Sequence, residues 1–140
     1  MTSLRDLGEF GAIGHIQEVL QGRALPFPVD VAIGDDAAVW QPTPGRRALE
    51  TTDLLIEDVH FSLAYFSWYD LGWKAMAVNL SDIAAMGGVP RAAFVSAGLK
   101  PDTSEDDLRD LYQGLADCAD QYQVRILGGD TVTSPLAVVL

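Results

Sequence analysis

YDLGWKAMAVNLSDIAAM, residues 69–86, is the stretch on which the prediction of the fold rests, because it has the composition of a buried helix. Apolar side chains occur almost all round it, and a helix of that kind packs inside a protein. Gly87-Gly88 and then Pro90 follow the stretch, in the order that ends helices. We therefore predict a buried helix that ends at the glycine pair.

One carboxylate in this helix needs an explanation, because burying an unpaired charge costs several kcal/mol. At ~100° per residue, Lys74 and Asn79 lie within ~80° on either side of Asp82. One interpretation is a buried ion pair between Lys74 and Asp82. The other is a carboxylate that binds a metal ion, and the remaining acidic residues of the chain favour it.

The elements on either side of the helix predict an α/β fold. Before it we expect a helix at 3–21 that begins at Ser3, then strands at 29–34, 37–40 and 47–55. After it we expect a strand at 92–99, a helix capped by Thr103 or Ser104, and strands at 124–127 and 136–140. This order predicts a mixed sheet with helices packed on one face.

The two outer helices have apolar residues at helical spacing. In the first helix these residues are Leu7, Phe10, Ile13, Ile16 and Leu20. In the last helix they are Leu108, Leu111, Tyr112, Leu115, Cys118, Ala119 and Tyr122. We expect both sets to face the core, so that packing is the simplest explanation of Tyr112.

Aspartates recur where predicted strands end, namely at Asp35, Asp36, Asp53 and Asp130. Each alone is typical of a turn, but ligand sites in α/β folds also gather at strand ends. Together with Asp82 and the hydroxyls of Thr51 and Thr52 they form an all-oxygen set, which favours Mg²⁺ over zinc or iron. Magnesium held by a few carboxylates generally bridges to phosphate, which indicates phosphoryl transfer.

The familiar phosphate-binding loops do not occur in the sequence, which has neither G-x-x-x-x-G-K-[ST] nor G-x-G-x-x-G after a strand. Gly128-Gly129-Asp130-Thr131 is either a backbone nest for phosphate or a plain turn after a strand. His60, beside Phe61, is by default a structural histidine. The residues alone therefore predict a Mg²⁺ site for a phosphorylated ligand.

Composition limits the partners and the location. With 140 residues, 9 Lys+Arg, 20 Asp+Glu and a net charge of −11, we expect one domain that binds neither nucleic acid nor an anionic membrane. The single Cys118 and the lack of an export signal or a membrane-length apolar run predict a cytoplasmic protein. Because the sequence stops within a predicted strand, we expect a fragment of a longer chain.

Four blocks of this sequence resemble the N-terminal domain of the thiamine-monophosphate kinase family, within the superfamily of aminoimidazole ribonucleotide synthetase and selenophosphate synthetase. The blocks are IGDDAA at 33–38, TTDLL at 51–55 with VHF at 59–61, KAMAVNLSDIAAMG at 74–87, and GGDT at 128–131. The resemblance implies the fold of that domain and ATP-dependent phosphorylation of thiamine monophosphate by direct in-line transfer.

The resemblance also implies roles for individual residues. It places the magnesium ions on Asp36, Thr51, Thr52, Asp53, Asp82 and Asp130. It places Gly129 and Asp130 at the nucleotide phosphates, Tyr112 at the nucleotide and His60 at the thiamine phosphate. It further implies a second, C-terminal domain outside residues 1–140, without which we expect negligible activity, and homodimers whose paired N-terminal domains complete the sheet.

Two alternatives stay open at this stage. One is another ATP-using member of the superfamily, a selenophosphate synthetase or a hydrogenase-maturation factor. Val59-His60-Phe61 weighs against both, and a selenophosphate synthetase normally carries a reactive residue near its N-terminus, whereas the only cysteine here is Cys118. The other alternative is a non-catalytic dimerisation module, which has no use for clustered carboxylates.

Overall fold

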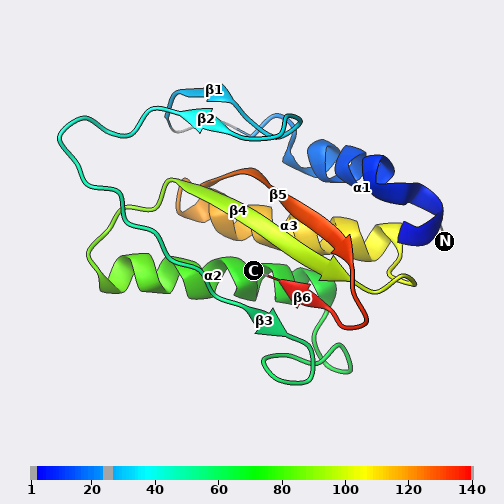
Figure 1. Cartoon of the computed structure of the whole chain (residues 1–140). Coiled ribbons are helices and arrows are strands. Elements are labelled where there is room, and N and C mark those ends of the chain that lie inside the picture. Colours follow the sequence, from blue (N-terminus) through cyan, green and yellow to red (C-terminus); the bar gives the residue numbers. More distant parts are fainter. Residues whose placement is uncertain (1–2, 24–26, 140) are drawn as a thin grey trace.

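A computed structural model of the chain describes residues 3–23 and 27–139 (Figure 1). Its elements in order are α1 (Leu4–Leu20), β1 (Val29–Val31), β2 (Val39–Trp40), β3 (Leu55–Ile56), α2 (Trp68–Ala85), β4 (Ala92–Leu99), α3 (Glu105–Gln121), β5 (Arg125–Thr133) and β6 (Val138–Val139). The predicted order of helices and strands is confirmed. Leu140, which we assigned to the last strand, lies outside the described residues.

The main sheet is mixed, as predicted, with the strand order β3-β6-β4-β5. β4 and β5 run parallel from the Ala92–Arg125 pair to the Leu99–Thr133 pair, whereas β6 is antiparallel to both β3 and β4. β1 and β2 form a separate antiparallel ribbon that lies beyond the β5 edge of the sheet (Figure 1).

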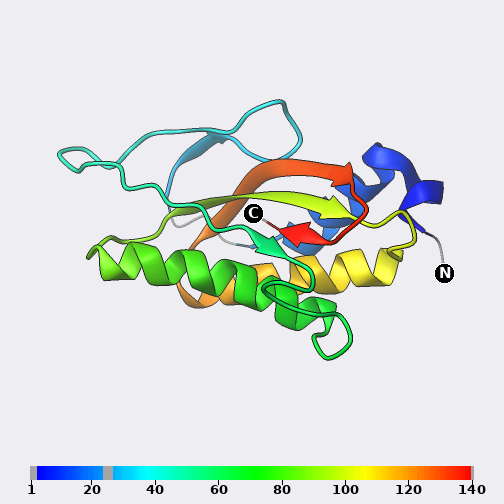
Figure 2. The same ribbon diagram turned by 60° about the horizontal axis from the view of Figure 1, so that its bottom comes forward.

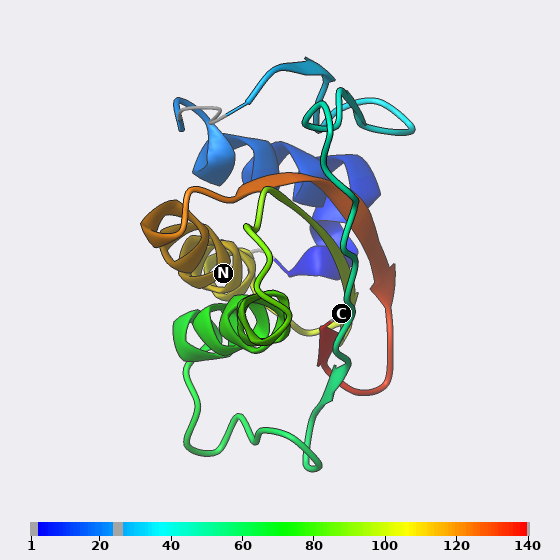
Figure 3. The ribbon, with the colours of Figure 1, turned by 90° about the vertical axis from the view of Figure 1, so that its left-hand side faces the viewer.

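Helices α2 and α3 lie side by side on one face of the main sheet (Figures 2 and 3). Two glycines allow their backbones to touch: a Cβ on Gly72 would lie 2.0 Å from the Leu111 carbonyl oxygen, and one on Gly114 would lie 2.0 Å from that of Tyr69. Below these contacts the helices bury residues such as Leu71 and Leu115 against β4 and β5. This pair of helices and the two parallel strands form much of the core, to which α1, β3 and β6 add residues such as Ile16, Leu55 and Val139.

The helices begin and end where short motifs place them. Ser67 Oγ accepts the backbone N–H of Asp70 at 3.0 Å, and Ser104 Oγ accepts that of Asp107 at 3.1 Å, each as part of a capping box. At the far end of α2, Gly87 adopts a φ of 68°, and a Schellman motif closes the helix. The predicted start at Ser104 and the predicted stop at the glycine pair are confirmed.

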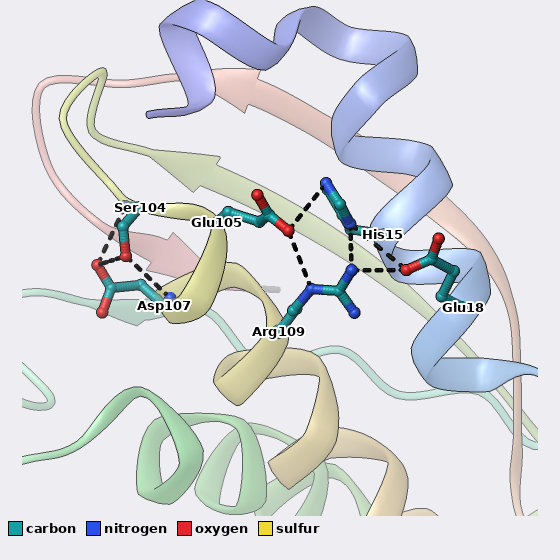
Figure 4. Close-up of polar contacts among 6 residues, drawn as sticks. All are labelled: His15, Glu18, Ser104, Glu105, Asp107 and Arg109. Atoms are coloured by element: carbon teal, nitrogen blue, oxygen red, sulfur yellow. Dashed lines mark hydrogen bonds and ion pairs between the residues drawn. The ribbon is translucent and has the colours of Figure 1, made fainter. Parts of the chain in front are cut away.

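A polar cluster fastens α1 to α3 (Figure 4). Arg109 on α3 donates to Glu18 and to Nδ1 of His15 on α1, and Glu105 lies 3.3 Å from Nε2 of the same histidine. The two ion-pair partners stabilise one another's charge: hydrogen bonding to Arg109 lowers the pKa of Glu18, and Glu18 raises the pKa of Arg109. The cluster lies at the outer side of the fold and links helices rather than strands.

Several strands are longer or shorter in the structure than the sequence predicted. The strands expected at 29–34, 37–40 and 47–55 are reduced to three, two and two residues. Residues 41–52 are exposed, and within the described part of the chain no strand pairs with residues 47–54, so this segment has no ladder to join. Conversely, β5 continues past Leu127 to Thr133, because it pairs with β4 along its whole length.

Burial was predicted wrongly for the second half of α2 and for two single residues, Phe10 and Tyr122. The second half of α2 is largely accessible, and Ser81, Asp82 and Met86 are exposed. Phe10 is 89% exposed because Gly8, with a φ of 68°, kinks α1 and changes which face meets the core. Tyr122 lies at the exposed end of α3, past its last buried turn. Among the described residues, no helix is both long enough and apolar enough to cross a membrane.

Candidate functional site

The accessible end of α2 brings together two of the predicted magnesium ligands. Thr51 Oγ1 donates a hydrogen bond of 3.0 Å to Oδ2 of Asp82. Both side chains line a shallow pocket with Leu49, Glu50, Ile83, Ala85 and Met86. Leu49, in the segment before β3, lies against Gly88, three residues past the end of α2. Residues separated by 31 positions in the sequence thus present a hydroxyl and a carboxylate to solvent together.

The buried ion pair that we considered for Asp82 is wrong. Lys74 Nζ donates to the carbonyl oxygen of His60 and lies 5.3 Å from the centre of the Phe66 ring. Asp82 is exposed, and no ion pair among the described residues joins it to Lys74. Among the residues that the structure describes, none holds a fixed cation against Asp82, so this carboxylate is available to a metal ion.

The other predicted ligands come from three separate segments. Asp36 is exposed between β1 and β2, where its backbone N–H donates to Oδ1 of Asp35 at 2.9 Å. Thr52 and the half-buried Asp53 immediately precede β3. Asp130 is exposed in the middle of β5, opposite Ser96 of β4. Asp130 was expected at a strand end, and that prediction was wrong.

A magnesium ion needs oxygen ligands, which these residues supply. Within residues 3–23 and 27–139, no three His, Cys, Asp or Glu side chains are grouped so that they could hold a metal by themselves. Mg²⁺, however, keeps several waters and binds through one or two carboxylates together with substrate phosphates. An exposed carboxylate beside a hydroxyl, as in the Thr51–Asp82 pair, fits that type of ligand set.

The Gly128–Thr131 block is part of strand β5, so the interpretation of it as a turn after a strand was wrong. Contact of this block with a phosphate stays a prediction. Gly129 has a φ of 154°, and a Cβ there would lie 1.8 Å from the Val95 carbonyl oxygen of β4. Only glycine at position 129 therefore lets the backbone of β5 approach β4 this closely. Because side chains alternate along a strand, Asp130 points to one face and Thr131 to the other.

Tyr112 links α3 to this part of β5. Its side chain is 3% exposed, which confirms its role in the core. Burial raises the pKa of Tyr112 to about 12; the charge of Asp130 adds to the increase, and a hydrogen bond from Thr131 opposes it. The phenol therefore stays protonated at neutral pH beside Asp130. Its contact with a nucleotide stays a prediction.

His60 is exposed and is held by its own backbone turn. The Ile56 N–H donates to Nδ1 of the imidazole at 3.1 Å, and the His60 N–H donates to the Ile56 carbonyl at 2.9 Å. Phe61, the next residue, is 2% exposed and anchors the turn in the core. With Nδ1 occupied as an acceptor, the neutral ring carries its proton on Nε2.

One charged residue near His60 was missed by the sequence analysis. Glu57 is 7% exposed and accepts Lys100 Nζ at 2.6 Å and the Ala137 backbone N–H at 3.1 Å. These contacts hold down the pKa of Glu57, mainly through the hydrogen bond from Lys100, so the buried carboxylate stays charged. In the sequence, Glu57 is an acidic residue after a short strand, and nothing there indicates that its partners lie far along the chain.

Known proteins resemble this chain in sequence and in structure. Residues 34–139 match the family described as AIR synthase related protein, N-terminal domain. The thiamine-monophosphate kinase of Bacillus subtilis is 44% identical over 106 residues, which are 76% of this chain and 33% of that protein. The chain thus spans about a third of the length of this relative.

Two solved structures share the fold. The crystal structure of thiamine-monophosphate kinase from Stenotrophomonas maltophilia K279a has a TM-score of 0.76 and 37% identity, over 94% of this chain and 40% of that one. AaThiL complexed with AMPPCP and TMP has a TM-score of 0.62 and 27% identity, over 99% of this chain and 42% of that one. The expected fold is confirmed by these two structures. By its sequence match over residues 34–139, the chain belongs to the AIR synthase related protein family and represents its N-terminal domain.

Proposed function

We propose that this chain is the N-terminal domain of a thiamine-monophosphate kinase, which transfers the γ-phosphoryl group of ATP to thiamine monophosphate and forms thiamine diphosphate. The observation that carries the proposal is the 44% identity to the Bacillus subtilis kinase over 106 residues. A structure of the similar AaThiL contains AMPPCP and TMP, which supports ATP as co-substrate. In this proposal a second domain of the full-length protein supplies the remaining contacts.

The proposed chemistry depends on positioning rather than on a covalent intermediate with the enzyme. Magnesium, when bound, neutralises the phosphate charge that develops during transfer. In this chain we assign its ligands to Asp36, Thr51, Thr52, Asp53, Asp82 and Asp130. In this proposal Gly129 and Asp130 of β5 lie by the nucleotide phosphates. Tyr112 packs next to this part of β5 from helix α3. These groups align the two phosphates, so that transfer proceeds directly from donor to acceptor.

His60 is the residue that we assign to the thiamine phosphate. Its imidazole is exposed, while its backbone carbonyl accepts Lys74 and its Nδ1 accepts Ile56. Since Nε2 is the nitrogen that bears the proton, it is the group that donates to a phosphate oxygen. Because ATP is the proposed phosphoryl donor, we also infer a cytoplasmic location.

Nucleotide and metal are expected to strengthen each other's binding. The carboxylates of the proposed site repel ATP unless Mg²⁺ neutralises them, and Mg²⁺ takes several of its ligands from the phosphates. Titration calorimetry on the full-length protein should give a clearly tighter ATP affinity with Mg²⁺ than with EDTA. An ATP affinity that is the same in both conditions would contradict the site.

The protein is expected to be a homodimer that pairs through the sheet face opposite α2 and α3. On β4, Val95 is 3% exposed towards the helices, whereas Phe94 is 49% exposed on the other face. The ring centroids of Phe94 and Trp40 are 5.8 Å apart, and Val132 on the neighbouring strand β5 is 54% exposed. We propose that a second copy of this chain covers these apolar side chains.

Light scattering at micromolar concentration tests the dimer. The wild-type protein should have the mass of two chains, and Phe94→Asp should shift it towards one, because the charge is placed in an apolar interface. Phe10→Asp is the matched control, since Phe10 is an exposed aromatic residue on α1. A monomeric wild-type protein, or equal behaviour of the two variants, would reject the interface.

A substrate panel separates the proposed activity from its alternatives. The full-length protein is incubated with MgATP and with thiamine monophosphate, thiamine or selenide, and the consumption of ATP and its nucleotide products are followed. We expect ADP formation that depends on thiamine monophosphate. ATP consumption with selenide alone, with AMP as the product, would indicate a selenophosphate synthetase. No ATP consumption by a protein that is still dimeric would indicate a non-catalytic module.

A further inference from the structure

Glu57 is a buried carboxylate that joins three segments far apart in the sequence. It lies directly after β3; its Oε1 accepts Lys100, which follows β4, and its Oε2 accepts the N–H of Ala137, which precedes β6. Both carboxylate oxygens thus have a partner within the protein. A buried acid with a full set of donors fixes the backbone on which it stands.

The backbone that Glu57 fixes is the turn that carries His60. Glu57 donates its own N–H to the Ala137 carbonyl at 3.0 Å, so two hydrogen bonds connect the same pair of residues. The chain then reverses through Asp58, which has a φ of 63° and donates its N–H to the Phe61 carbonyl at 2.7 Å. His60 closes the turn onto Ile56, the residue before Glu57.

We propose that Glu57, paired with Lys100, is a positioning residue that holds the His60 ring with Nδ1 facing the Ile56 N–H, which leaves Nε2 to carry the proton. The hydrogen bond from Ile56 to Nδ1 needs the backbone at 56 and 57 to stay in place, and the Glu57 contacts secure it there. The His60 ring then offers a donor to an anionic oxygen rather than a base. This inference rests on the proposed function only in naming that oxygen as the phosphate of thiamine monophosphate.

The charge on Glu57 is maintained by its surroundings. Its pKa is lowered chiefly by the hydrogen bond from Lys100, with desolvation acting in the opposite direction. Other charged groups next to the turn are Asp58, which is exposed, and Lys74 on α2, which donates to the His60 carbonyl. Lys74 therefore supports the same turn from the helix side.

The test uses Glu57→Gln in the full-length protein and two readouts. Nitrogen-15 NMR of labelled histidine, assigned with His60→Gln, reports the ring tautomer without any need for activity. The wild-type protein should show the Nε2–H form of His60. In folded Glu57→Gln we expect a mixture of tautomers, with KM for thiamine monophosphate raised at least about tenfold and KM for ATP unchanged.

Two further variants serve as controls. Lys100→Arg keeps the ion pair and should behave as the wild-type protein does. Glu105→Gln removes another ion-paired carboxylate, whose Oε1 lies 3.3 Å from Nε of Arg109. This ion pair is remote from the His60 turn, so the variant should change neither readout. If Glu57→Gln does not fold, Lys100→Gln is measured in its place, since it removes the cation but leaves a donor.

The outcomes separate this inference from the proposed function. A folded Glu57→Gln or Lys100→Gln variant that keeps the single Nε2–H tautomer and an unchanged KM would overturn the positioning role. A wild-type protein that makes no thiamine diphosphate would instead overturn the proposed function. The tautomer comparison would then still decide whether Glu57 positions His60.

Discussion

Asp82→Asn is expected to lower the rate of thiamine diphosphate formation by at least ~10²-fold, on the order of 3 kcal/mol of transition-state stabilisation. The substitution keeps the shape of the side chain and its capacity to accept the hydrogen bond from Thr51 at 3.0 Å. It removes the negative charge that, in our proposal, holds magnesium at the transferring phosphate. Steady-state kinetics of the full-length protein measure the effect.

The stability of the same variant distinguishes a metal ligand from a structural residue. Because Asp82 is exposed and Lys74 contacts His60 instead, neutralising Asp82 strands no buried cation. The free energy of unfolding without Mg²⁺ should stay within about 0.5 kcal/mol of the wild-type value. Asp110→Asn, at an exposed position of α3, is the matched control and should keep full activity. A strongly destabilised Asp82→Asn whose folded fraction is fully active would contradict the assignment.

Gly114→Ala is expected to lower the free energy of unfolding by about 3 kcal/mol or more. The added Cβ would lie 2.0 Å from the Tyr69 carbonyl oxygen and 3.0 Å from the Trp73 nitrogen, and both of these are backbone atoms of α2. The clash can be relieved only if the two helices move apart, which opens the core between them. Urea unfolding of the full-length protein measures the loss.

A glycine in another helix provides the control for this prediction. Gly14 lies within α1, and a Cβ there would meet nothing within 4 Å. Gly14→Ala should therefore be neutral or stabilise by up to about 1 kcal/mol, because alanine favours the helix. If Gly114→Ala unfolds at the same urea concentration as Gly14→Ala, the close packing of α2 on α3 is wrong.

The helices could be predicted well from the sequence because their signals are local. Ser104 with Asp107, and Gly87 after α2, fix helix ends through contacts within a few residues. The strands were harder, because a strand depends on a neighbour that the sequence does not identify. Gly128-Gly129 has the composition of a turn, yet the pairing of β5 with β4 continues the strand through it.

The candidate site was predictable in its residue types but not in its arrangement. Acidic residues and threonines indicated oxygen ligands, but only the folded chain places Thr51 next to Asp82. The apolar composition of α2 suggested a buried Asp82, whereas the buried contacts occupy the first half of the helix and leave Asp82 exposed. Glu57 gave no signal, because its partners Lys100 and Ala137 are 43 and 80 positions away.

Phosphorus NMR of the full-length protein with ATP, thiamine monophosphate and Mg²⁺ tests the central claim most directly. We predict that thiamine diphosphate and ADP appear in equal amounts, without inorganic phosphate, and that EDTA stops both. This result would establish phosphoryl transfer from ATP to thiamine monophosphate that depends on the metal. ADP that appears together with inorganic phosphate but without thiamine diphosphate, or product formation that continues in EDTA, would contradict the account.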